Sequence, residues 1–106
     1  MTTGRLDQLA ALRAELDALD ERLREMLRTR FALCCEIGDH KRALGMSLVQ
    51  HERVRIVQAN AARFALEHGM NPEFMRDLYS LLIDEAHRLE GEVFARRRTS
   101  TGVDNQ

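Results

Sequence analysis

The clearest structural pattern of this chain lies in LRAELDALDERLREMLRTR, residues 12–30. Its apolar residues recur at alternating steps of three and four, and the same spacing extends from Leu9 to Ile37. Such a heptad-like seam predicts a helix that buries one face against other helices. Nothing breaks the pattern between Leu9 and Gly38, and it continues to about Ala43. We therefore predict one long helix of roughly 35–38 residues.

A second helix follows a break at Gly45. Ser47 and Gln50 have the spacing of a capping box, with Ser47 as N-cap and Gln50 at the third helical position. This pattern predicts a helix over about residues 48–68. Gly69 is a suitable residue to end it.

The third helix begins with a strong start signal at residues 71–73, Asn-Pro-Glu. Asn is a preferred N-cap, Pro suits the first helical position, and an acid suits the first turn. We expect this helix to end near Arg96 and the polar tail, residues 97–106, to be disordered. The chain is thus predicted to be all-α, with one long and two shorter helices in a domain of residues 1–96.

The unequal lengths of these helices predict a homodimer. The second and third helices, at about 30–37 Å, cannot cover a first helix of about 55 Å. Part of the apolar seam would then face water unless another chain covered it. We expect the long helices of two copies to pack together.

Composition limits the class of partner. The net charge of −1 over 106 residues gives no field that attracts nucleic acid or an anionic membrane. No apolar run approaches the ~20 residues of a membrane span. The N-terminus lacks the apolar core of a secretory signal, so we expect a cytoplasmic protein. No spacing of His and Cys resembles a metal site.

Charged residues occupy positions where apolar ones are expected. Arg30 stands on the seam of the first helix, and Lys41 lies within ~20° of the same face. Arg53 takes an apolar position on the second helix, and Glu90 does so on the third. Unpaired charges are costly to desolvate, and guanidinium groups bind carboxylates bidentately. One interpretation is a pocket for a compact dianion; the other is apolar stems along the core with charged heads in water.

Arg13 lies about 100° away from the face of Arg30. It cannot easily reach the same pocket from its own chain. In an antiparallel pair of long helices it could reach the pocket of the partner. Taken alone, it would be a surface residue of the helix.

The chain resembles the all-helical chorismate mutases, which are intertwined homodimers of three-helix chains. The resemblance extends over about residues 6–93. It rests on residues 12–30, on EIGDHK at 36–41, on ERV at 52–54 and on LLIDEAHRLE at 81–90. It implies a Claisen rearrangement of chorismate to prephenate, without a cofactor, in two active sites per dimer.

Carried over by position, the resemblance implies a role for each site residue. Lys41 and Glu90 would be the catalytic residues beside the enol ether oxygen. Arg30 and Arg53 of one chain and Arg13 of the other would hold the two carboxylates. The remaining substrate-binding positions would be Gln50, Val54 and Ala86. Such a site would hold a near-attack shape and stabilise charge that develops on the ether oxygen.

Four of these positions depart from the usual residues of the family. Val54 replaces an acid that contacts the C4 hydroxyl, Gln50 an Asp, Ala86 a Ser and Glu90 a Gln. An ionised Glu90 cannot donate a hydrogen bond to an ether oxygen. Either it is protonated, which burial favours and nearby cations oppose, or it accepts a hydrogen bond from a cation. A 4-amino group on the substrate would be such a cation.

Glu90 and the stretch MSLVQHERV, residues 46–54, are similar to a subgroup of the family, the 4-amino-4-deoxychorismate mutases of antibiotic pathways. The substrate is therefore predicted to be 4-amino-4-deoxychorismate or chorismate, with the amino compound favoured. One alternative is an isochorismate-pyruvate lyase, which tolerates Val54 but keeps a glutamine at position 90. Another is a non-catalytic helical dimerisation or regulatory module.

Overall fold

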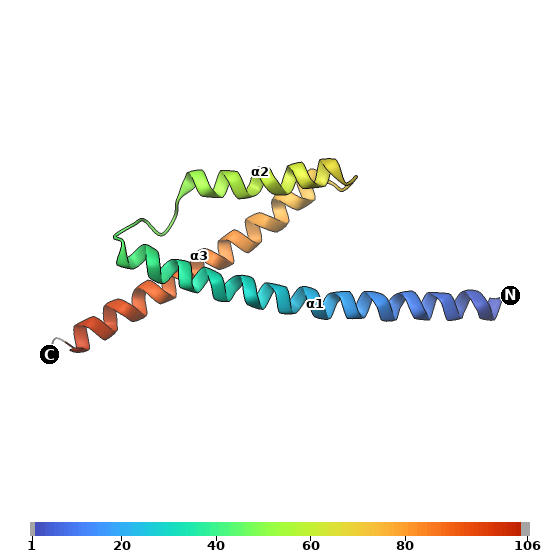
Figure 1. The fold of residues 1–106 in the computed structure, drawn as a ribbon, viewed down its shortest axis with the longest axis horizontal. Coiled ribbons are helices and arrows are strands. Elements are labelled where there is room, and N and C mark those ends of the chain that lie inside the picture. The colour runs from blue at the N-terminus through green and yellow to red at the C-terminus, as the bar shows by residue number, and fades with distance from the viewer. Residues whose placement is uncertain (1, 105–106) are drawn as a thin grey trace. The chain divides into compact units, whose positions relative to one another are not determined.

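The computed structural model describes residues 2–104, with the side chains of residues 4–96. This part of the chain contains no strand and has the helices α1 (Thr2–Ala43), α2 (His51–Glu67) and α3 (Pro72–Asp104) (Figure 1). The predicted all-α class with one long helix is confirmed. Between residues 2 and 104, no helix combines the length and the apolar character needed to cross a membrane. The chain divides into two units, Met1–Ala32 and Leu33–Gln106, which are described in turn.

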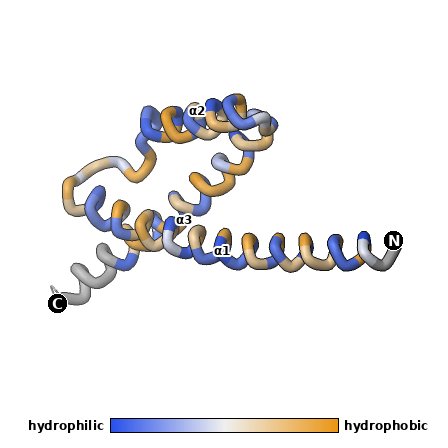
Figure 2. The backbone as a smooth tube through the Cα atoms, turned by 45° about the vertical axis from the view of Figure 1, so that its right-hand side comes forward, coloured by the Kyte–Doolittle hydropathy of each residue, from blue (hydrophilic) through white to orange (hydrophobic). Residues whose placement is uncertain are grey.

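The first unit is the N-terminal part of α1. Apolar and polar residues alternate along this helix (Figure 2). Its seam residues are 41–68% exposed. They are Leu6, Leu9, Leu12, Leu16, Leu19, Leu23 and Met26. A single helix has no core of its own, so this seam requires another apolar surface to leave water.

The end of α1 belongs to the second unit and follows local sequence signals. Gly45 adopts φ +68°, a left-handed conformation that costs glycine little. The backbone N–H of Met46 donates to the carbonyl of Lys41 at 2.8 Å, and that of Gly45 donates to Arg42 at 3.1 Å. This pair of bonds is the Schellman motif. The predicted break at Gly45 is confirmed.

The start of α2 differs from the prediction. Residues 46–50 are not helical; Gln50 is the N-cap, with φ −114° and ψ 97°, and its side chain makes no capping hydrogen bond. Lys41 Nζ, seven residues earlier, donates a 2.7 Å hydrogen bond to the carbonyl of Leu48. This carbonyl is bound by a side chain of α1, and the helix begins only after Gln50, so the predicted capping box from Ser47 was wrong.

The turn between α2 and α3 matches the prediction. Gly69 adopts φ +67° and ends α2 as expected. Asn71 Oδ1 accepts hydrogen bonds from the backbone N–H groups of Glu73 at 2.9 Å and Phe74 at 3.2 Å. These bonds satisfy two donors that a helix N-terminus otherwise leaves open.

Small side chains allow α2 and α3 to pack as a helical hairpin. The buried apolar residues of the two helices are Ala61, Ala62, Ala65, Ile83, Ala86 and Val93. A polar contact also links the helices, because Gln58 Nε2 donates to Ser80 Oγ at 3.0 Å. Most of this core is alanine, so the hairpin buries little apolar area for its length.

The third helix is longer than predicted. It runs to Asp104 rather than ending near Arg96. The arginines that begin the tail are good helix formers. No proline or glycine lies between Arg96 and Gly102. The domain boundary at residue 96 stays a prediction, and residues 105–106 lie outside the described part.

Candidate active site

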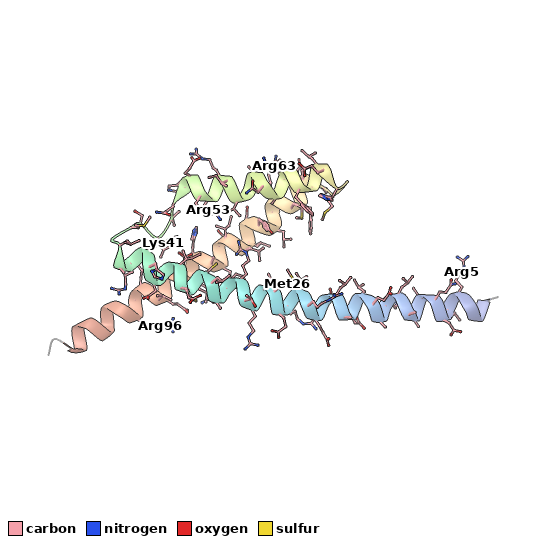
Figure 3. All side chains as sticks on the ribbon, viewed as in Figure 1. Arg5, Met26, Lys41, Arg53, Arg63 and Arg96 are labelled. Carbon is pink, nitrogen blue, oxygen red and sulfur yellow. The ribbon has the colours of Figure 1, made fainter. Side chains whose placement is uncertain are left out.

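A buried ion pair joins the last turn of α1 to α3. Lys41 Nζ lies 2.8 Å from Glu90 Oε1, and the two side chains are only 13% and 5% exposed. Figure 3 places Lys41 near the C-terminal end of α1. The sequence predicted both residues at the reacting bond, and the structure brings them into direct contact.

The same ammonium has a second acceptor on the protein. Lys41 Nζ also donates to the carbonyl of Leu48, in the segment between α1 and α2. A lysine ammonium has three N–H donors. Glu90 and Leu48 take two of them among the described contacts, which leaves one for a ligand oxygen. Lys41 is thus held from two sides and can present a fixed cation.

The other predicted residues of the second unit lie on α2 and α3. Gln50 and Val54 are half-buried and stand one turn apart, because the N–H of Val54 donates to the carbonyl of Gln50 at 3.1 Å. Arg53 is exposed at the start of α2 (Figure 3). Ala86 is buried, 6% exposed, one turn before Glu90 on the same face of α3.

Arg13 and Arg30 belong to the first unit. Arg13 is exposed, whereas Arg30 is half-buried although it carries a charge. Their predicted place in the site, including a site shared between two chains, stays a prediction.

Sequence reasoning missed two contributors to the site. Gly38 is buried where α1 meets α3 at Glu90, and Leu48 supplies its carbonyl to Lys41. A glycine inside an otherwise uninterrupted helical pattern was the available signal for Gly38. No side-chain pattern could identify Leu48, because a backbone atom makes the contact.

A separate charge cluster covers the exposed side of α3. Arg88 donates to Glu85 at 2.7 Å and to Glu92 at 2.8 Å. The hydrogen bond between Arg88 and Glu85 lowers the pKa of Glu85 and raises the pKa of Arg88. Such solvated pairs contribute little to stability, and they provide matched controls for the buried pair.

The donor set of the site is suited to binding a charged organic ligand. Within the described part of the chain, no three His, Cys, Asp or Glu side chains gather as a metal site would require. The buried pair instead offers one ammonium and one carboxylate at fixed positions. A fixed ammonium in a site of low exposure can stabilise negative charge that develops on a bound oxygen.

Within residues 2–104 the chain is helical, and the buried pair of Lys41 and Glu90 joins its first helix to its third. A sequence model of the chorismate mutase type II family matches residues 12–91. The chain belongs to this family, and the predicted mutase-type isomerase activity is confirmed.

Two relatives are named 4-amino-4-deoxychorismate mutase. The chain is 47% identical over 89 residues to that of Streptomyces pristinaespiralis, a match covering 84% of this chain and 69% of the relative. It is 40% identical over 90 residues to that of Streptomyces venezuelae, covering 85% and 87%. A T-protein of Enterobacter agglomerans is 27% identical over 85 residues, covering 80% of this chain and 23% of the relative. No solved structure matches the chain.

Proposed function

We propose that this chain rearranges 4-amino-4-deoxychorismate to 4-amino-4-deoxyprephenate in preference to chorismate. This proposal rests on the environment of the Glu90 side chain, which is 5% exposed and accepts a 2.8 Å hydrogen bond from Lys41. A carboxylate acceptor suits a substrate ammonium, whereas an ether oxygen requires a donor. The names of the two relatives support the same substrate. That substrate fits the antibiotic-type pathway that the resemblance predicts.

The rearrangement requires no proton transfer, nucleophile or cofactor. Within one molecule the ether C–O bond breaks while a new C–C bond forms, so the protein acts by positioning and electrostatics. Lys41 donates to the ether oxygen as that oxygen gains negative charge. Arg30 and Arg53 bind the two carboxylates, which fixes the compact conformation. Val54 offers no acid to a C4 hydroxyl.

The proposed active enzyme is a homodimer of this chain. The seam of the first unit remains 41–68% exposed, and a second copy provides a surface of matching chemistry. Large apolar side chains also stay exposed on α2 and α3 of the second unit, among them Phe64 at 49% and Phe74 at 56%. Burying both surfaces together removes them from water. In this assembly Arg13 of one chain completes the site of the other.

Leu16→Glu tests this assembly, because it places a charge in the middle of the seam while keeping a good helix former. We expect the variant to be monomeric at micromolar concentration in analytical ultracentrifugation. We also expect it to lose at least about tenfold in turnover, since each site then lacks a positioning group. Ala14→Glu, on the opposite face of α1, should stay dimeric and active. A dimeric Leu16→Glu variant with full activity would contradict the proposal.

The substrate proposal is tested by comparing turnover of three candidate substrates. Purified protein is offered 4-amino-4-deoxychorismate, chorismate and isochorismate separately, and products are quantified by chromatography. A charge-assisted hydrogen bond contributes about 1.5–3 kcal/mol, so we expect kcat/KM to favour the amino compound by roughly 10- to 100-fold. Faster turnover of chorismate would overturn the preference. Release of pyruvate from isochorismate would instead identify a lyase.

A further inference from the structure

Gly38 of α1 lies directly against Glu90 of α3. A Cβ built on this residue would lie 2.8 Å from Glu90 Cγ, 3.0 Å from Glu90 Cβ and 3.2 Å from Glu90 Cα. Carbon atoms at ordinary contact stand about 3.5–4.0 Å apart. Only a residue without a side chain therefore fits at position 38.

A Cβ added at position 38 would clash with the part of Glu90 that cannot move independently of its helix. The three atoms are the root of its side chain and its backbone, not a flexible tip. Relief would require a shift of α3 or another rotamer of Glu90. Either change would displace the Oε1 atom that Lys41 holds at 2.8 Å. Lys41 stands three residues after Gly38 on the same side of α1, so the contact and the ion pair belong to one local arrangement.

The other two helical glycines among residues 4–96 do not share this constraint. A Cβ on Gly4 would meet nothing within 4 Å, and one on Gly91 would meet only Leu48 Cδ1, at 3.7 Å. Glycine is unfavourable inside a helix. Gly38 has this unfavourable helix propensity, and it makes a close packing contact with Glu90 of the buried pair.

We propose that Gly38 is a positioning residue for the reaction: its missing side chain lets α1 approach α3 closely enough for Lys41 and Glu90 to hold their catalytic geometry. This inference rests on the proposed function, because it assumes that the pair acts on the bound substrate. Gly38 acts through Glu90 and does not need to contact the substrate. A purely structural glycine would instead affect stability and leave the chemistry of the folded enzyme unchanged.

Gly38→Ala tests the proposal, with Gly91→Ala and Gly4→Ala as matched controls. We expect kcat of Gly38→Ala on 4-amino-4-deoxychorismate to fall about 10- to 100-fold, as a displacement near 1 Å can cause. KM should rise by a smaller factor, because the Lys41 contact to the ether oxygen strengthens in the transition state, whereas the Glu90 contact to the 4-ammonium group is also made in the ground state. Both control variants should keep kcat within about twofold, since their new methyl groups meet ordinary or no contacts. All assays are run well below the melting temperature of each variant.

A double variant separates positioning from general damage to the fold. Glu90→Ala removes Cγ, the nearest of the three atoms, and with it the carboxylate through which Gly38 would act. In that background we expect Gly38→Ala to lower the residual kcat by less than about threefold, because two residues of one contact act non-additively. If Gly38→Ala lowered kcat by the same factor in this background as in the wild-type protein, Gly38 would not act through Glu90, and the proposal would be overturned.

A substrate-independent measurement distinguishes failure of this inference from failure of the proposed function. In NMR spectra of ¹⁵N-labelled protein, the Lys41 ammonium should give a slowly exchanging signal, since two protein acceptors hold it. That signal should be lost in Gly38→Ala and kept in Gly91→Ala. If wild-type protein turns over no substrate but this pattern holds, the substrate proposal fails and the positioning contact stands. If Gly38→Ala keeps both its signal and its kcat, the positioning role is wrong.

Discussion

Replacing Lys41 by methionine is expected to lower kcat/KM by about 10²–10³-fold. The methionine fills a similar volume but has no charge to stabilise the ether oxygen. It also leaves Glu90, 5% exposed, as a buried carboxylate without its cation. Breaking such a buried pair costs about 3–5 kcal/mol in the free energy of unfolding. Urea unfolding at a fixed chain concentration measures this loss, because dimer stability depends on concentration.

A second variant separates the two effects of this substitution. In Lys41→Met/Glu90→Leu both charges of the pair are removed, so most of the lost free energy of unfolding should return. The activity should not return. Arg28→Met is the matched control: Arg28 forms an exposed pair with Glu25 at 3.5 Å on the same helix, and its loss should cost no more than about 1 kcal/mol. If Lys41→Met kept turnover within threefold of wild type, the pair would be structural alone.

Replacing Glu90 by glutamine is expected to change substrate preference. The amide oxygen can still accept the hydrogen bond from Lys41, and the amide NH₂ adds a donor that a carboxylate lacks. The charge that would bind the 4-ammonium group is lost, so kcat/KM for 4-amino-4-deoxychorismate should fall about 10- to 100-fold. Turnover of chorismate should rise, because the new donor can reach the ether oxygen. The measurement is the ratio of kcat/KM values for the two substrates.

The control for this prediction makes the same substitution two residues away. Glu92→Gln removes an exposed partner of Arg88 on α3 and should leave the substrate ratio unchanged. An unaltered ratio in Glu90→Gln would mean that this residue does not discriminate the 4-amino group. A fall in turnover of both substrates by the same factor would have the same meaning, since only a differential effect reports on specificity.

Local signals in the sequence predicted some helix boundaries correctly and others wrongly. Asn71 and Gly69 were placed correctly, because capping bonds and left-handed turns depend on neighbours within a few residues. Ser47 was misassigned because its capping pattern competed with the side chain of Lys41, seven residues before Leu48, which binds the carbonyl of Leu48. Arg96 was misassigned as a helix end because a polar composition does not by itself stop a helix.

The order of residues alone was enough to predict the helical class, the end of α1, the start of α3 and the apolar seam of α1. These features depend on periodicity and on local hydrogen bonds, both of which the order of residues specifies. The hydrogen bond between Lys41 and Glu90, which are 49 residues apart in the chain, is seen only in the folded structure. The same holds for the contact of Gly38 with Glu90. Contacts between distant residues follow from how helices pack, and helix packing depends on shape complementarity that no local pattern encodes.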